Sequence, residues 1–424
     1  MAETNRLHGF LTPWRIKWYS RSLLFAISIA FIIAVFGGKD ASTLTGRLGG
    51  DYPAFYGAGR IIAEGDWENL YSPTRQLKIQ KDLFPHEKNG FLPFSYPPFV
   101  ALAYYPLSLF GYRNSYIIHS LLMVSALVLT IQLIRPFNSL IDRYKLCVLA
   151  LSLSFYPLFR AIWGGQNTAV ILLLIVGTWR MALAHREWLA GIILGLLLFK
   201  PQFAIPLIGL FILSGRWRVG LGSAFTAVVL YSISSWISGP LWLASWYKFT
   251  WWFSQTDAGV NSANSVSWLG FLEAIGGSKN YVALIIGWIM VLLTIIWSGL
   301  IWTVGGRRAD LTAQLGITMP ALVLMPPHVM YYDISLILFT YVTMVAVNPE
   351  KFSLIIGFIW LFGFSQVAGT ILGFSPLFFL LPYTSILAVR YLSRLAINPD
   401  PSSSFFNLFP LKPEFKQSSW FKRL

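Results

Sequence analysis

The sequence contains very little cysteine and few charged residues. Cys147 is the only cysteine among 424 residues, so an intrachain disulfide and a thiolate metal cluster are both excluded. Only 12% of the residues are charged, whereas soluble domains contain about 25%. The chain is also 56% hydrophobic, far more than one water-exposed domain needs. The lipid bilayer is therefore the expected environment of this protein.

Several catalytic and metal-binding motifs are also missing. The chain has no D-x-D pair, no P-loop, no G-x-S-x-G or H-E-x-x-H sequence and no Cys/His cluster. We therefore expect neither a metal ion nor a cofactor. The net charge of +15 would suit a nucleic-acid-binding protein. The basic residues, however, form short clusters between apolar runs, as they do on the cytoplasmic side of membrane proteins. Nucleic acid is not an expected partner.

The apolar runs predict an all-α fold, a polytopic transmembrane helical bundle of roughly eleven to thirteen segments. The first run, residues 22–37, follows a basic stretch and has no cleavage site after it. We therefore expect an uncleaved signal anchor, with residues 1–21 in the cytoplasm. The transmembrane domain would span residues 22–395, and a basic tail, residues 396–424, would lie in the cytoplasm. This organisation is typical of a multi-pass membrane protein.

Two longer polar stretches are predicted to lie outside the membrane. Residues 38–96 would form the first outer loop, with amphipathic helices at about Pro53–Glu64 and Pro73–Leu83. Residues 238–280 would form the second outer loop. The same topology brings four unusual polar stretches to the outer side. They are GGD at 49–51, RAIWGGQN at 160–167, KPQ at 200–202 and PPHVMYYD at 326–333.

Asp51 is the candidate catalytic residue, because it is the only carboxylate of the GGD stretch and directly follows the first span. An aspartate is ionised at neutral pH and can take the proton from an attacking hydroxyl group. Glycosyl transfer with inversion needs only one such base when the leaving group, such as a phosphate, departs without protonation. The alternative is that Asp51 merely caps the helix that begins near Pro53.

Three basic side chains are candidates for binding a donor phosphate. Lys200 lies between two apolar runs, where an unpaired ammonium is costly, so it either binds a phosphate, pairs with an acid or snorkels. Arg160 either assists it or is an ordinary boundary residue. His328 follows two prolines and either hydrogen-bonds a phosphate or sugar oxygen or has a structural role.

Four other polar side chains are candidates for binding the sugar or the acceptor: Gln166, Asn167, Arg60 and Tyr332. Gln166 and Asn167 could instead cap the following helix, and Tyr332 and Asp333 could act as a cap in the same way. Arg60 could face lipid headgroups. Asp333 is the second candidate acid.

Short motifs in a fixed order connect the chain to a known family. They are DYPAFYGAGR at 51–60, FSYPPF at 94–99, GGQNTAV at 164–170, FKPQFAIPL at 199–207, NSVSWLGFL at 264–272 and PPHVMYYDISL at 326–336. Together they resemble glycosyltransferase family 87, the polyprenol-phosphate-mannose-dependent α-(1,2)-mannosyltransferases.

The resemblance implies a GT-C fold with juxtamembrane helices and an active site outside the cytoplasm. It also implies metal-independent, inverting transfer of a hexose from a polyprenyl-phosphate donor to a glycan or glycolipid acceptor of the cell envelope. Asp51 would be the catalytic aspartate, and the donor phosphate would lie near Lys200, His328 and Arg160.

Two other classes of protein remain as alternatives. A polytopic transporter or lipid flippase would also use broken helices around a buried lysine. Against it, the sequence shows no internal repeat and no series of buried acids for proton coupling. A scaffold subunit of an envelope assembly, with Asp51 only a helix cap, is the third reading.

Overall fold

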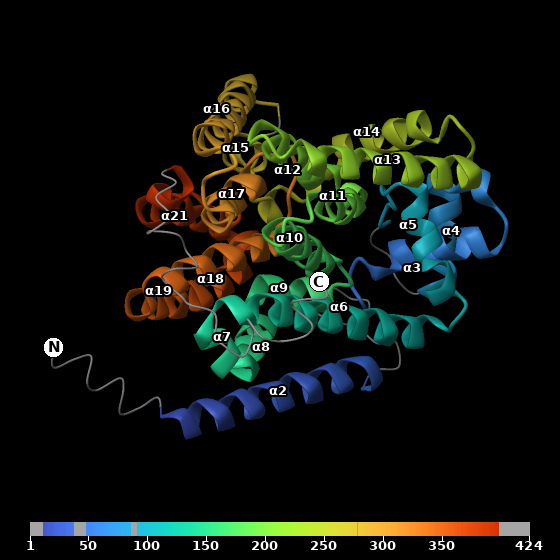
Figure 1. Ribbon diagram of the computed structural model, residues 1–424. Coiled ribbons are helices and arrows are strands. Elements are labelled where there is room, and N and C mark those ends of the chain that lie inside the picture. Colours follow the sequence, from blue (N-terminus) through green and yellow to red (C-terminus); the bar gives the residue numbers. More distant parts are fainter. Residues whose placement is uncertain (1–11, 38–47, 86–90, 278, 398–424) are drawn as a thin grey trace.

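A computed structural model of the protein describes residues 12–37, 48–85, 91–277 and 279–397 (Figure 1). Within these ranges the regular structure is helical, and the β pairing is limited to one isolated antiparallel bridge between Ser265 and Met330. The predicted all-α fold is confirmed. Most of the predicted basic tail lies outside the described residues, as do residues 1–11.

Six described helices are long and apolar enough to cross a membrane. They are α2 (Pro13–Phe36), α6 with the 3-10 turn η2 (Tyr112–Phe137), α13 (Trp217–Ser238), α16 (Tyr281–Gly305), Ile355–Leu372 and Pro376–Ser393. The first of the last two spans overlaps α19 (Pro349–Phe362) and includes α20 (Gly369–Leu372). The second includes η7 (Pro376–Phe379) and most of α21 (Leu380–Ile397). The protein is therefore a polytopic helical bundle.

Shorter apolar helices complete the bundle. α8 (Lys145–Ser154) and α9 (Tyr156–Trp163) meet at 74° and form a broken span or a re-entrant loop. The others are α10 (Thr168–Leu183), α11 (Glu187–Leu196) with η3 (Leu197–Phe199), α12 (Pro201–Leu213), α17 (Leu311–Leu324), and η5 (Tyr331–Leu336) with α18 (Ile337–Val347). The predicted number of segments is reached only when these short helices are counted with the long ones.

The helix α17 forms the centre of the bundle, since all 14 of its residues are buried. It packs against α16, α18 and α21. Its threonines supply partners for buried indoles. The Nε1–H of Trp302 donates to the hydroxyl of Thr318 at 2.8 Å, and that of Trp179 donates to Thr312 at 3.1 Å. These bonds satisfy polar groups that would otherwise be expensive inside the bundle.

The first predicted outer loop contains the two expected helices, α3 (Tyr52–Ala63) and α4 (Pro73–Leu83), with a short turn η1 (Trp67–Asn69) between them. α3, α4 and α5 (Pro98–Ser108) lie together at one end of the molecule in Figure 1. The Ser72 hydroxyl caps α4 by accepting the Arg75 N–H at 3.4 Å. Both helices begin at the predicted turns to within one residue.

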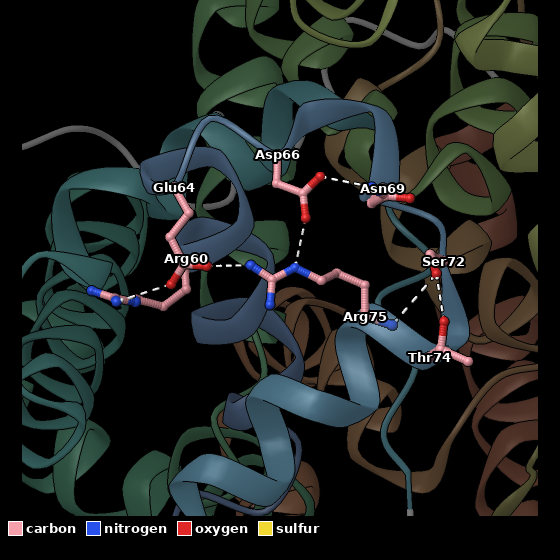
Figure 2. Close-up of polar contacts among 7 residues, drawn as sticks. All are labelled: Arg60, Glu64, Asp66, Asn69, Ser72, Thr74 and Arg75. Carbon is pink, nitrogen blue, oxygen red and sulfur yellow. Dashed lines mark hydrogen bonds and ion pairs between the residues drawn. The ribbon is translucent and has the colours of Figure 1, made fainter.

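A network of charged side chains joins α3 to α4 (Figure 2). Arg75 donates from Nε to Asp66 at 2.6 Å and from Nη2 to Glu64. Glu64 also accepts from Arg60 at 3.0 Å. Hydrogen bonds from Asn69 and from Arg75 lower the pKa of the Asp66 carboxyl group. The network therefore fixes the end of α3 against the start of α4.

The second predicted outer loop contains α14 (Trp242–Val260) and α15 (Trp268–Gly276). The indole Nε1–H of Trp246 donates to the carbonyl oxygen of Ser95 at 2.9 Å. Ser95 belongs to the FSYPPF stretch that leads into α5. The two predicted outer loops are therefore in direct contact, although 151 residues separate the bonded pair.

Candidate active site

Two glycine pairs, Gly49–Gly50 and Gly164–Gly165, bring the Asp51 segment against the loop that follows α9. The backbone N–H of Asp51 donates to the carbonyl oxygen of Gly164 at 2.9 Å. Gly165 has φ 71°, and a Cβ added there would lie 2.4 Å from the Cβ of Tyr52. Gly50 has φ 50°, and its added Cβ would lie 3.0 Å from the Cα of Gly164. Only glycine fits both the backbone conformation and the close approach.

Gln166 orients Asp51 directly. Its Nε2 donates to the Oδ2 of Asp51 at 2.6 Å. An ionised carboxylate only accepts hydrogen bonds, so the amide must turn its NH₂ group towards Asp51. This fixes the other amide atom, Oε1, as an acceptor. The Oε1 of Gln166 and the Oδ1 of Asn167 are both buried without a hydrogen-bond partner in the described part of the chain. A ligand hydroxyl would satisfy either atom.

Asp51 is more than a helix cap. It occupies the N-cap position of α3, but its side chain makes no capping hydrogen bond to the first turn. The carboxylate bonds instead to Gln166, which is 115 residues away in the sequence. Capping of the first turn therefore does not account for the contact of this side chain with Gln166. The role of Asp51 as a catalytic base stays a prediction.

Lys200 and Asp333 form a buried ion pair. Pro201 begins α12 and leaves Lys200 at the break between η3 and α12. The Nζ of Lys200 lies 3.2 Å and 3.1 Å from the two carboxylate oxygens of Asp333, and the side chains are only 4% and 5% exposed. The Thr168 hydroxyl also donates to Asp333, at 2.7 Å. Of the alternatives considered for Lys200, the structure shows the pairing with an acid.

Arg160 has a different kind of partner. It lies in the last turn of α9, is half-buried, and donates from Nε to the hydroxyl oxygen of Tyr331 at 3.1 Å. Tyr331 is the first residue of η5, and its ring stacks on that of Tyr156 at 6.2 Å. Arg160 is also close enough to Asp51 for the two charges to interact.

These contacts gather the candidate residues into one site. Tyr332 interacts electrostatically with both Asp51 and Asp333. Its ring centroid lies 5.7 Å from the Nζ of Lys200. Burial, followed by the negative charges of Asp333 and Asp51, raises the pKa of the Tyr96 hydroxyl. Both carboxylates therefore lie within electrostatic range of the same two tyrosines, Tyr96 and Tyr332.

Two of the predicted residues, His328 and Arg60, make their described contacts with residues outside this group. His328 is exposed on the loop after α17, close enough to Glu273 for their charges to interact. That loop is tied to the start of α15, because the Ser267 hydroxyl donates to the carbonyl oxygen of Pro327 at 2.9 Å. Arg60 forms its ion pair with Glu64 in the network of Figure 2. The binding roles of His328 and Arg60 stay predictions.

Two residues of the site, Tyr331 and Thr168, were not predicted individually, although both lie in motifs named from the sequence. Tyr331 precedes the predicted Tyr332, and in a sequence nothing distinguishes two adjacent tyrosines. Thr168 directly follows the GGQN stretch and begins α10, where a threonine is unremarkable. Asp333 was only the second candidate acid. Knowledge of its contact with Lys200, 133 residues away in the sequence, would have identified Asp333 as a site residue.

The fold and site define a multi-pass helical membrane protein with buried or half-buried carboxylates and cations gathered between its helices. The family model of glycosyltransferase family 87 matches residues 94–326, over half of the chain. The chain belongs to this family and is a membrane glycosyltransferase. No curated protein and no solved structure matches it. Arg160 and Lys200 lie within the matched residues, whereas Asp51 and Asp333 lie outside them.

Proposed function

We propose that the protein transfers a hexose from a polyprenyl-phosphate donor to a glycan or glycolipid acceptor, with inversion at the anomeric carbon. Mannose is the sugar that the family resemblance implies. The reaction would take place on the outer side of the bacterial inner membrane, in a GT-C fold. The observation that carries this proposal is the carboxylate of Asp51, oriented by Gln166 and within electrostatic range of Arg160.

Asp51 acts as the general base in this mechanism. Its carboxylate accepts the proton of the acceptor hydroxyl while the hydroxyl oxygen attacks the anomeric carbon. A new glycosidic C–O bond forms, the bond between the sugar and the phosphate breaks, and polyprenyl phosphate leaves with the bonding electrons. A phosphate needs no proton to depart, so one carboxylate is sufficient. The acceptor atoms of Gln166 and Asn167 would receive sugar hydroxyl groups.

Cations beside the leaving group supply the electrostatic stabilisation. The donor is a phosphodiester with one negative charge, and the departing phosphate monoester gains a second charge. Fixed positive groups in a dry site favour this increase more strongly than water-exposed ones do. Two contacts support this role: Lys200 pairs with Asp333, and Arg160 is close enough to Asp51 for their charges to interact. No observation favours a transporter or a scaffold.

The experiment compares Asp51→Asn with the native protein, both purified in the same detergent. Transfer of radiolabelled sugar is measured from a small panel of polyprenyl-phosphate sugars. Because general base catalysis contributes about 10²–10⁴ in rate, we expect Asp51→Asn to lose at least roughly 100-fold in activity. Asp82→Asn, at an exposed acid of α4, is the matched control and should keep its activity. Native turnover in Asp51→Asn would show that Asp51 is not the base.

A further inference from the structure

The two cations of the site are held in different ways. Lys200 bonds to both oxygens of Asp333, so an opposite charge already neutralises it. Arg160 bonds through Nε to Tyr331, which is a neutral phenol. No hydrogen bond involves the terminal nitrogens Nη1 and Nη2 of Arg160 in the part of the chain that the structure describes. Lys200 uses up to two of its three N–H groups on Asp333, whereas Arg160 keeps both terminal nitrogens, each with two N–H groups, for a ligand.

The bond to Tyr331 sets the orientation of those remaining donors. A guanidinium group is planar and carries five N–H groups in a fixed fork. When Nε is held, the plane is fixed and the two terminal nitrogens present a pair of donors suited to two phosphate oxygens. A lysine ammonium would act only as a point charge at the same place.

Tyr331 is itself well fixed. Its ring lies nearly parallel to that of Tyr156, with an interplanar angle of 22°. Two residues further along η5, Asp333 is held by Lys200 and Thr168. The buried ion pair therefore anchors the short helix that carries Tyr331. This chain of contacts runs from α12 through η5 to the last turn of α9.

We propose that Tyr331 is a positioning residue for Arg160, and that Arg160, rather than Lys200, binds the phosphate of the donor. This inference rests on the proposed function. To bind a phosphate, Lys200 would have to leave or share the carboxylate of Asp333, whereas Arg160 needs no partner removed. Because Arg160 and Asp51 are within electrostatic range, the anomeric carbon can lie between the base and the cation that receives the leaving group.

The test is a double-mutant cycle with Tyr331→Phe and Arg160→Gln. Tyr331→Phe removes one oxygen atom and keeps the ring stack, so the fold should be retained. A hydrogen bond to a charged group is worth about 1.5–3 kcal/mol, so we expect kcat/KM to fall by roughly 10- to 100-fold. In the Arg160→Gln background, the same change should have almost no further effect, since there is no guanidinium left to orient.

A binding measurement separates a positioning role from a merely structural one. The probe is polyprenyl phosphate, tested as a product inhibitor of the native protein and as a directly bound ligand of Asp51→Asn. Arg160→Gln and Tyr331→Phe should weaken its binding at least tenfold. Tyr231→Phe, which removes a hydroxyl bonded to the carbonyl oxygen of Pro240 on the distant α13 side, is the control and should not.

The outcomes distinguish this inference from the proposed function. If Asp51→Asn is inactive but Tyr331→Phe and Arg160→Gln match the native protein, the inference is wrong and the proposed function stands. If Lys200→Gln weakens polyprenyl phosphate binding and Arg160→Gln does not, Lys200 is the phosphate ligand. Additive effects of Tyr331→Phe and Arg160→Gln would also overturn the positioning role. Full activity of Asp51→Asn would contradict the proposed function instead.

Discussion

The buried pair of Lys200 and Asp333 leads to a quantitative prediction about stability. Asp333→Asn keeps the shape of the side chain but removes its negative charge. The amide oxygen can still accept the hydrogen bond from Thr168, which is 2.7 Å long in the native site. The amide nitrogen would then face the ammonium of Lys200, a donor against a donor. Lys200, at 4% exposure, would keep its 3.2 Å hydrogen bond to the remaining oxygen but lose the opposite charge that compensates it.

Removal of one partner from a buried ion pair typically costs about 3–5 kcal/mol, because the remaining charge stays out of water. We expect Asp333→Asn to be destabilised by about this amount. Replacement of both partners leaves no uncompensated buried charge, and such replacements often change the stability very little. The double variant Lys200→Met, Asp333→Asn should therefore recover most of the lost stability. The recovery is the quantity that identifies the ion pair as the cause.

The assay is thermal unfolding in one detergent, followed by tryptophan fluorescence, with the exposed Asp82→Asn as the control. Three results are expected: a clearly lowered midpoint for Asp333→Asn, a native midpoint for Asp82→Asn, and an intermediate or near-native midpoint for the double variant. If Asp333→Asn unfolds at the native temperature, the pair does not stabilise the fold. If the losses of Lys200→Met and Asp333→Asn simply add, the two residues are not coupled.

Two further predictions concern the segments that frame the site. Gly165→Ala should abolish transfer, because the new Cβ would lie 2.4 Å from the Cβ of Tyr52 in a backbone conformation with φ 71°; size-exclusion behaviour like that of the native protein would show that the loss is local. Hydrogen bonds from Asn69 and Arg75 lower the pKa of Asp66, so the network of Figure 2 stabilises the loop at neutral pH and weakens as the pH falls through that lowered value. Amide protection factors in α4, which correct for the intrinsic pH dependence of exchange, should be lower below the lowered pKa of Asp66 than at neutral pH, and unchanged protection would contradict this.

Much of the fold could be predicted because its signals are local. Pro73 with Ser72 before it marks the start of α4, and Pro201 marks the break before α12. Apolar runs identified the long spans, since lipid tolerates only segments whose backbone bonds are internal. The shorter helices were harder to classify, because a run of 10 to 17 apolar residues suits a span, a re-entrant segment or a buried core helix.

The site could be predicted only in part, because its pairings are long-range. The positive-inside bias brought GGD, GGQN and KPQ to one side, but it carries no distances. The contact between Gln166 and Asp51 depends on two glycine pairs that meet across 115 residues. From sequence alone, Gln166 was equally suited to cap a helix. For Lys200, pairing with an acid was one of three alternatives, and the sequence did not select Asp333 as the partner.

The binding partner of each cation in the site indicates how much of its charge remains available to a ligand. A cation paired with a carboxylate is stable in a dry site but has little charge left to offer a ligand, as with Lys200 and Asp333. A cation held by a neutral hydroxyl keeps its field, and desolvation makes that field stronger. Tyr331 supplies such a hydroxyl to Arg160. In the proposed mechanism, this arrangement separates two tasks that one buried cation performs poorly. The ion pair fixes η5, and the arginine oriented by η5 remains available for the charge that would develop on a leaving phosphate.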